Sequence, residues 1–404
     1  MTEPSTAPAF PATRTPGCPF DPPAEFAKLR DDDPISQASC PAGIDAWVVT
    51  RYEDVRAVLA DQRLSSRGAP SAHVVPGVSL DQPIAPGNML RMDGADHARL
   101  RRMLTAEFTV RRIEAMRPYI RRIVDEHLDA MLAGPRPADL YQAFALPIPS
   151  LVICELLGVP YEDRDDFHQQ SAVLVAVDSP PAIRQAAFQQ IQRYMTALFE
   201  AKQVDPADDL ISRLIRRGEE SGQPFTGQEM VSLGATLLIA GHETTANMIA
   251  LSTVALLQHQ DELAKLRANP DLAQPAVEEM LRYLSVVQFG LLRHATEDIR
   301  LGGITVKSGE WLVAALGSGN RDEAVYPDAD RIDLARTAKT HLAFGFGIHQ
   351  CLGQQLARVE LQEVYARLFR RIPTLRLAVA VADLEYKDNT LVYGVHELPV
   401  TWEG

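Results

Sequence analysis

The sequence predicts a mainly α-helical fold with small β-sheets. Apolar residues recur at helical spacing over many stretches, the longest of which covers residues 228–258. Stretches of strand-forming residues are all short. No linker, charge block or internal repeat interrupts residues 45–404, whereas residues 1–23 carry seven prolines and no amphipathic period. We therefore expect one domain over residues 25–404 behind a flexible, proline-rich arm at residues 1–24.

The periodicity gives each element a position along the chain. Predicted helices cover residues 53–59, 97–108, 113–132, 150–157, 183–201, 208–217, 228–258, 275–283 and 352–369. Predicted strands cover residues 46–49, 299–301, 304–306, 311–315 and 375–379, with a hairpin near 390–400. The helix at 228–258 has a defined start, because Thr226 and Glu229 form the capping-box pattern. At 1.5 Å per residue it would be about 45 Å long, enough to cross the domain.

The charge of the chain excludes some functions and points to one surface. A formal net charge of −13 argues against general nucleic-acid binding, because proteins that follow phosphates carry a basic excess. Between Arg91 and Arg122, however, nine arginines stand against four acidic residues. This segment is either a solvated, salt-bridged helix face or a docking surface for an acidic partner.

The N-terminal segment and the cysteines bear on location. No basic region followed by an apolar region opens the chain, so we expect neither a signal peptide nor a membrane anchor. Four scattered cysteines do not suggest a disulfide framework. We expect a cytoplasmic monomer that binds neither membrane nor nucleic acid.

One cysteine stands in an unusual setting. Residues 344–353 read Phe-Gly-Phe-Gly-Ile-His-Gln-Cys-Leu-Gly, and the glycines let the backbone fold closely around Cys351. Such a loop can turn amide groups towards a thiolate, which at neutral pH needs such neighbours or a metal. A buried, inert cysteine is the alternative. A dinucleotide-binding loop is not supported, because Gln350 stands where the third glycine of that pattern belongs.

The long predicted helix carries polar residues at its centre, in the segment Ala240-Gly241-His242-Glu243-Thr244-Thr245. A membrane-spanning helix is disfavoured, because no uncharged stretch of about 18 residues remains. A zinc-binding helix is excluded, because Ala246 replaces the second histidine of that motif. The Thr244 hydroxyl can donate to the carbonyl of Ala240 and loosen the helix, leaving room for water or a small ligand. The alternative is a polar stripe that faces solvent.

The cysteine loop and this helix segment together resemble the cytochrome P450 family, and the resemblance covers about residues 25–404. It implies the cytochrome P450 fold, in which haem b lies between a long distal helix and the helix that follows the cysteine loop. It also implies a monooxygenase that uses O2 to hydroxylate a small molecule. The thiolate of Cys351 would be the proximal iron ligand, and its electron donation would favour cleavage of the O–O bond.

The resemblance assigns further residues to the cofactor. Phe344 and Gly345 match positions beside the sulfur, and Gly241 matches the glycine that leaves space above the haem. Glu243 and Thr244 match the acid and the threonine that deliver protons to bound oxygen. The haem propionates need cationic donors, and the family supplies them at the positions of His97, Arg101, Arg293 and His349.

Glu279 and Arg282 lie one turn apart on the predicted helix at 275–283, close enough to form an ion pair. Taken alone, this would be an ordinary surface salt bridge. With the segment Asn320-Arg321-Asp322 downstream, it resembles the Glu-x-x-Arg motif of the family, which locks to an arginine before the cysteine loop. The resemblance gives that third role to Arg331, with Arg336 as the alternative.

The resemblance also places a substrate pocket along the distal helix, the segment before Arg293, the C-terminal hairpin, and loops at about 66–90 and 168–185. Apolar residues dominate the assigned lining: Ile239, Ala240, Val287, Phe289, Leu291, Leu391 and Val392. This favours a bulky, hydrophobic ligand, although each residue can equally belong to the core. The chain most resembles actinobacterial members that hydroxylate polyketides, macrolides, statins or steroids, which sets the expected substrate class.

The sequence offers no second glycine-rich strand–helix unit for a flavin or NADPH. Electrons are therefore expected from a ferredoxin and its ferredoxin reductase, and the arginines of residues 91–122 suit an acidic iron–sulfur protein. Two other classes share the cysteine loop. A haem-thiolate peroxygenase would need neither the arginines nor the Glu243–Thr244 pair, and a non-catalytic haem sensor would also gain nothing from a lid. The acid–threonine pair argues against both.

Overall fold

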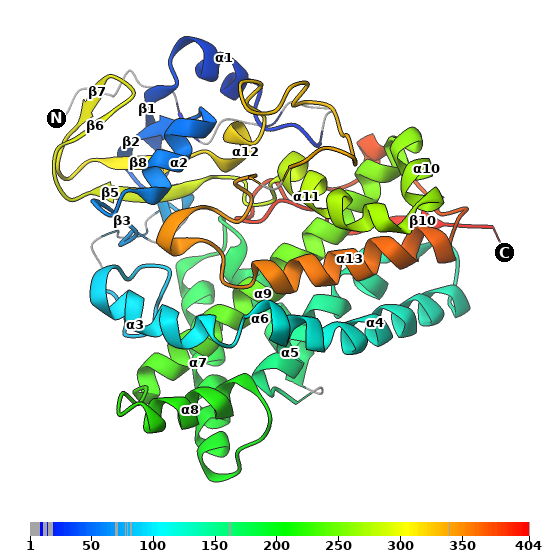
Figure 1. The fold of residues 1–404 in the computed structure, drawn as a ribbon, viewed down its shortest axis with the longest axis horizontal. Helices are drawn as coiled ribbons and strands as arrows, with labels where there is room; N and C mark the ends of the chain where they lie inside the picture. Colours follow the sequence, from blue (N-terminus) through cyan, green and yellow to red (C-terminus); the bar gives the residue numbers. More distant parts are fainter. Residues whose placement is uncertain are drawn as a thin grey trace. The chain divides into compact units, whose positions relative to one another are not determined.

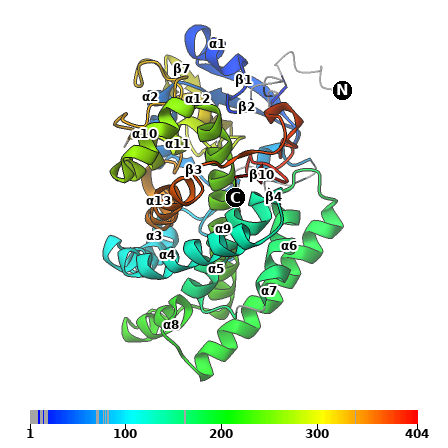
Figure 2. The ribbon, with the colours of Figure 1, turned by 90° about the vertical axis from the view of Figure 1, so that its right-hand side faces the viewer.

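The computed structural model describes residues 9–10, 14, 19–68, 72–76, 78, 80, 83–160, 163–338 and 340–403. The chain forms two compact units, each built from several segments (Figures 1 and 2). The first unit comprises Met1–Ile84, Leu90–Asp93 and Glu278–Cys351, and the second comprises Ala85–Met89, Gly94–Val277 and Leu352–Gly404. The expectation of a single domain over residues 25–404 stays a prediction.

The first unit contains most of the strands. Its five-stranded sheet has the order β1 (Ile35–Cys40), β2 (Ile44–Val49), β8 (Trp311–Ala314), β5 (Leu291–Ala295) and β3 (Leu64–Ser65). Only the β2–β8 pair is parallel. A separate ribbon pairs β6 (Ile299–Leu301) with β7 (Ile304–Val306). The helical elements are α1 (Glu25–Asp32), α2 (Tyr52–Ala60), η1 (Ala72–Val74), α12 (Leu316–Gly319) and η5 (Gly347–His349).

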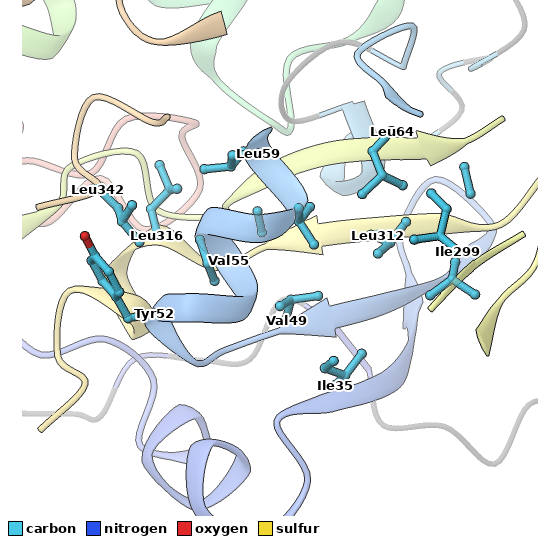
Figure 3. Packing of buried hydrophobic residues seen from close by; sticks show 14 of the residues in the cluster. Ile35, Val49, Tyr52, Val55, Leu59, Leu64, Ile299, Leu312, Leu316 and Leu342 are labelled. Atoms are coloured by element: carbon cyan, nitrogen blue, oxygen red, sulfur yellow. The ribbon is translucent and has the colours of Figure 1, made fainter. Parts of the chain in front are cut away.

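Helix α2 seals one face of this sheet. Figure 3 shows Val55 and Leu59 of α2 lying over Val49 and Leu312 of the strands, in one buried hydrophobic cluster. The cluster also contains Leu342, which stands just before the cysteine loop. Burying such side chains stabilises a fold by about 1.5–3 kcal/mol each. The core therefore fixes the segment from which the cysteine loop departs.

The second unit is mostly helical. Its helices are α3 (Gly94–Thr105), α4 (Val110–Ala133), α5 (Pro147–Leu157), α6 (Arg164–Val175), α7 (Pro181–Val204), α8 (Leu210–Glu220), α9 (Gly227–Gln258), α10 (Gln260–Ala268) and α13 (Gln354–Arg371). Helix α11 (Ala273–Leu284) begins in this unit and ends in the first. Single turns occur at η2 (Tyr141–Ala145), η4 (Pro270–Leu272) and η6 (Val381–Asp383). A small sheet has the order β4 (Ala138–Asp139), β10 (Pro399–Thr401), β9 (Arg376–Leu377).

Helix α9 organises the second unit. It packs against α5, α7 and η2, while α4 and α13 lie side by side (Figure 1). Its start is the predicted one, because the Thr226 hydroxyl accepts from the amide of Glu229 and the Glu229 carboxylate accepts from the amide of Thr226. The helix then runs without interruption to Gln258.

Each predicted helix is present, but the structure also contains elements that the sequence did not predict. Helices α1, α6 and α10 and strands β1 and β5 were not expected. Strand β1 reads Ile-Ser-Gln-Ala-Ser-Cys, which lacks strong strand formers, and β5 contains Arg293 and His294 within its apolar run. The hairpin near 390–400 forms in part: Tyr386 and Val395 pair in an antiparallel bridge, flanked by hydrogen bonds from the amides of Lys387 and His396 to the carbonyls of Gly394 and Glu385.

The described part of the arm at residues 1–24 contacts the first unit. Phe10 is buried, and its ring lies 6.4 Å from that of Phe26 and 5.5 Å from that of His73. The carboxylate of Asp21 pairs with Arg321 at 3.0 Å. The flexibility of the arm stays a prediction. Within the described residues, no helix is long and apolar enough to cross a membrane.

Candidate active site

The loop that carries Cys351 depends on two glycines in the left-handed backbone region. Gly345 and Gly347 have φ values of +67° and +75°, which side-chain-bearing residues rarely adopt. A Cβ on Gly347 would also lie 2.4 Å from the carbonyl oxygen of Leu59. The amide of Cys351 donates to the carbonyl of Phe344 at 2.9 Å, which closes the loop. The Cys351 side chain is exposed, so the loop presents a thiol that can bind a metal.

The first unit also holds a buried positive charge at Arg293 of β5. Only 3% of this residue is exposed, and its Nη1 donates to the carbonyl of Leu292 at 2.8 Å. Burial lowers the pKa of Arg293 to about 10, against an opposing effect of Asp93. Among the described residues no carboxylate forms an ion pair with Arg293. A buried guanidinium of this kind fits a cofactor that carries carboxylates, as haem does.

His349 is held by an aspartate that the sequence analysis did not single out. Its Nε2 lies 3.0 Å from Oδ1 of Asp93. Asp93 also accepts from the Ser65 hydroxyl at 2.5 Å and from the amide of Ser66 at 3.1 Å. Burial alone would raise the pKa of Asp93, but the bonds from His349 and Ser65 lower it. The carboxylate therefore fixes the orientation of His349.

The other two residues assigned to the propionates, His97 and Arg101, lie one turn apart on α3 in the second unit. His97 is 3% exposed and Arg101 is half-buried. The first unit brings Arg293, Asp93 and His349 together, and the second places His97 and Arg101 on one helix face. A joint role for the four predicted cations stays a prediction.

Helix α9 has one open face at its centre. Most of its residues are buried, but Thr236, Ala240 and Thr244, at successive helical turns, are half-buried or exposed. Ile239 and Gly241 border this face and are half-buried. The stripe is where a ligand can reach an otherwise buried helix.

Gly241 has a packing role in addition to the one predicted for it. A Cβ built on this residue would lie 2.9 Å from Cγ1 of Ile153 on α5. The missing side chain therefore allows α5 to approach α9 closely. The predicted space above the cofactor at Gly241 stays a prediction.

The acid and the threonine have different environments. The Thr244 hydroxyl donates to the carbonyl of Ala240 at 3.0 Å, as predicted, although α9 is not broken there. Glu243 is 2% exposed. Burial alone would raise the pKa of Glu243, but the hydrogen bond from His168 and the charge of Lys387 lower it to about 2. Glu243 is thus a buried, ionised carboxylate beside a threonine on the open face.

The residues assigned to the substrate differ in exposure. On α9, Ala240 is exposed and Ile239 half-buried, as a pocket wall requires. Val287 and Leu291 pack against the hydrophobic cluster of the first unit. The other three are Phe289 and Val392, which are buried, and Leu391, which is half-buried.

The C-terminal segment and the loops at about 66–90 and 168–185, which were also assigned to the substrate pocket, follow the prediction in part. Leu391 donates its amide to the carbonyl of Val175 at 2.8 Å, so the C-terminal segment lies against the end of α6. Within 168–185, residues 168–175 belong to α6, so the loop is shorter than expected. In the loop at 66–90, residues 69–71, 77, 79 and 81–82 lie outside the described part of the chain.

The Glu-x-x-Arg motif forms a fully buried cluster in the first unit. Two hydrogen bonds of 2.8 Å join Glu279 to Arg282, and both side chains are 0% exposed. The arginine that completes the cluster is Arg336, whose Nε lies 3.2 Å from Oε1 of Glu279. The assignment of Arg331 is therefore wrong: its side chain is exposed, and only its carbonyl accepts from Arg282, at 3.2 Å. Arg336 also donates to the carbonyls of Pro327 at 2.6 Å and Asp328 at 3.1 Å, which help to hold its guanidinium beside Glu279.

Some of the arginines of residues 91–122 form ion pairs with carboxylates of the chain itself. Ion pairs with carboxylates involve Arg99, Arg112, Arg117, Arg121 and Arg122. Arg102 and Arg111 are exposed, and among the described residues no carboxylate pairs with them. A salt-bridged helix face thus describes part of the segment, while exposed arginines on α3 and α4 remain open to a partner.

Comparisons with known proteins show the family to which the chain belongs. The sequence model of the family described as Cytochrome P450 matches residues 181–372. Cytochrome P450-SU2 of Streptomyces griseolus is 47% identical over 402 residues, 99% of this chain and 98% of that protein. Pentalenic acid synthase of Streptomyces avermitilis is 46% identical over 407 residues, 100% of both. The crystal structure of CYP105P1 in complex with filipin I has a TM-score of 0.92 at 43% identity, covering 98% of this chain and 99% of that one.

The helical fold and these relatives define a haem-thiolate monooxygenase. The chain belongs to the cytochrome P450 family. The cofactor is haem b with a cysteine thiolate ligand, and the enzyme uses dioxygen, redox partners and a hydrophobic substrate. The predicted fold class is thereby confirmed.

Proposed function

We propose that Cys351 is the iron ligand of this monooxygenase and that the enzyme hydroxylates a bulky, hydrophobic secondary metabolite of the polyketide, macrolide, statin or steroid class. The observation that carries the proposal is the open face of α9, where apolar Ala240 and hydroxyl-bearing Thr244 stand among buried neighbours. The substrate class is supported by CYP105P1, which has been crystallised with filipin I.

Different residues of the chain would bind the cofactor, deliver protons and contact the substrate. Haem supplies the activation of dioxygen and the transfer of its oxygen atom. Arg293 and His349 would hold its carboxylates. Thr244 would hold a proton donor at the bound oxygen, and Glu243 would supply protons. Ile239, Ala240, Val287 and Leu291 would present apolar surface to the substrate.

A ligand screen with a coupling measurement tests this function. Filipin I, a simple macrolide, a statin and a steroid are added to the haem-loaded protein, and we expect at least one to shift the iron from low to high spin and to be hydroxylated. Thr244→Ala should bind that compound as the parent does but form less product per reductant oxidised, by about tenfold or more, because proton delivery is disturbed. No spin shift with any compound would contradict the substrate class, and unchanged coupling would remove Thr244 from the mechanism.

The electron donor is proposed to be a ferredoxin that docks on the exposed arginines of α3 and α4. Arg102 and Arg111 are the best residues to test, because neither holds an internal carboxylate in place. Arg112 is less suitable, since its guanidinium lies 3.4 Å from the buried Glu107. Exposed charges of this kind steer association and are screened over about 10 Å at 0.1 M salt.

Reversal of both charges, Arg102→Glu with Arg111→Glu, is expected to slow reduction by an acidic ferredoxin about tenfold or more at low salt and to flatten its salt dependence. Peroxide-driven turnover should not change, because it bypasses the donor. Arg300→Glu with Arg376→Glu is the matched control, since both arginines are exposed and lie on β6 and β9. Equal reduction rates for the two double variants across salt concentrations would show that α3 and α4 do not form the docking surface.

A further inference from the structure

We propose that His168 passes protons from solvent to Glu243, and that Lys387 keeps the Glu243 carboxylate ionised and aligned to receive them. This inference rests on the proposed role of Glu243 in proton delivery. Insertion of one atom of dioxygen into a C–H bond reduces the other atom to water, which consumes two protons and two electrons for each product. A buried carboxylate can sustain that demand only if another group returns protons to it.

Groups from several elements of the second unit converge on Glu243. Nε2 of His168, on α6, lies 3.5 Å from Oε1. Nζ of Lys387, in the C-terminal segment, lies 3.6 Å from Oε2, and Nδ2 of Asn247 donates to the same oxygen at 3.1 Å. Lys387 also donates to the Tyr141 hydroxyl of η2 at 2.7 Å. Each carboxylate oxygen therefore has its own cationic or protonatable partner.

Exposure separates the two basic partners. The side chain of His168 is 31% exposed, against 11% for Lys387 and 2% for Glu243. His168 is thus the partner with access to solvent, and imidazole is the side chain that ordinarily gains and loses a proton near neutral pH. Lys387 is held by Tyr141 on its other side and acts as a fixed charge. From these positions we assign proton exchange with solvent to His168 and alignment of the Glu243 carboxylate to Lys387.

A second histidine, His242, extends the proposed proton path beyond His168. Nδ1 of His242, on α9, lies 2.8 Å from the carbonyl of Leu238, so Nδ1 carries the proton and Nε2 is an acceptor. That Nε2 is buried and has no hydrogen-bond partner among the described residues. Burial lowers the pKa of His242, which keeps the ring neutral. Its ring centroid lies 5.9 Å from that of His168. An unpartnered buried acceptor beside His168 is a natural position for an ordered water.

The remaining titratable group at the cluster does not compete for the proton. Burial and the nearby Glu243 raise the pKa of Tyr141 well above its ordinary value, so its hydroxyl stays protonated. Burial lowers the pKa of Lys387, while Glu243 opposes that effect. Lys387 and Glu243 therefore each support the charged form of the other.

The test compares dioxygen-driven with peroxide-driven turnover of the fluorogenic probe ethoxycoumarin by the haem-loaded, full-length chain. His168→Gln retains hydrogen bonding but cannot exchange protons. We expect it to lower the dioxygen-driven rate by about tenfold or more, to increase the solvent isotope effect and to flatten the pH profile near neutrality. Peroxide-driven turnover should stay within about twofold, because peroxide already carries its protons. His127→Gln, at a half-buried histidine of α4, should match the parent throughout.

The role of Lys387 is tested without turnover. Lys387→Met should raise the pKa of Glu243, so the infrared difference spectrum between the variant and the parent at neutral pH should show an additional protonated-carboxyl band. Burial raises the pKa of Glu360 as well, so its protonated-carboxyl band is common to both proteins and cancels. The double variant Lys387→Met with Glu243→Gln should lose that band. Absence of the band in Lys387→Met would overturn the alignment role.

The outcomes separate the relay from the enzyme's function. Equal dioxygen-driven rates and isotope effects for His168→Gln and the parent would overturn the relay. A parent that oxidises neither ethoxycoumarin nor filipin I with either oxidant would instead count against the proposed function, and the infrared measurement would still decide the state of Glu243.

Discussion

Replacement of Cys351 with serine is expected to abolish dioxygen-driven turnover and the strongly red-shifted absorption band of the reduced, CO-bound enzyme. Serine and histidine both lack the electron donation of a thiolate, so Cys351→His should lose the same band even if it still binds haem. The loop geometry should survive, because the residues with positive φ are Gly345 and Gly347 and the Cys351 contact to Phe344 uses the backbone amide.

Cys40→Ala provides the matched control for this experiment. Cys40 is buried, and burial raises its pKa to about 12, so it stays a protonated, inert thiol. The control should keep both the band and the activity. Retention of the red-shifted band in Cys351→Ser would show that another residue binds the iron.

Replacement of Arg282 with methionine is expected to lower the free energy of unfolding by about 3–5 kcal/mol, because it leaves the carboxylate of Glu279 buried without its main partner. Arg282 also donates to the carbonyls of Asn320 at 2.9 Å and Ala329 at 2.8 Å. Asn320 in turn accepts from the amide of Leu342 at 2.6 Å. The loss should therefore reach the segment before the cysteine loop and weaken haem retention.

Denaturant titration of the haem-loaded variants measures this effect. Arg331→Ala is the control and should change the unfolding free energy by less than about 0.5 kcal/mol, because its side chain is exposed. Arg336→Ala should be intermediate and provides a folded variant if Arg282→Met does not accumulate. An Arg331→Ala variant as unstable as Arg282→Met would contradict the contacts described for this cluster.

Local patterns predicted the parts of the fold that depend on local physics. The start of α9 follows from the Thr226–Glu229 capping box, and the positive φ of Gly345 and Gly347 follows from the need to close the loop around Cys351. Gly353 is different, because its φ is −80° and a Cβ there would meet nothing within 4 Å. Spacing identified a glycine-rich loop but not which glycines are obligatory.

Local sequence patterns could not predict contacts between residues that are far apart in the chain. Asp93 and His349 are 256 positions apart, and nothing local signals their hydrogen bond. Arg336 reaches Glu279 while it also donates to the carbonyls of Pro327 and Asp328, and these contacts could not be seen in the resemblance that favoured Arg331. Lys387 lies in an irregular segment, where no periodicity indicates a side chain that turns to Glu243.

The most direct test of the central claim is turnover of a screened substrate under isotopically heavy dioxygen in ordinary water, with ferredoxin and reductase as the electron source. We expect that each product molecule gains one heavy oxygen atom, that none comes from water, and that catalase does not stop the reaction. Product that carries oxygen only from water, or that forms only when peroxide is added, would contradict a dioxygen-dependent monooxygenase.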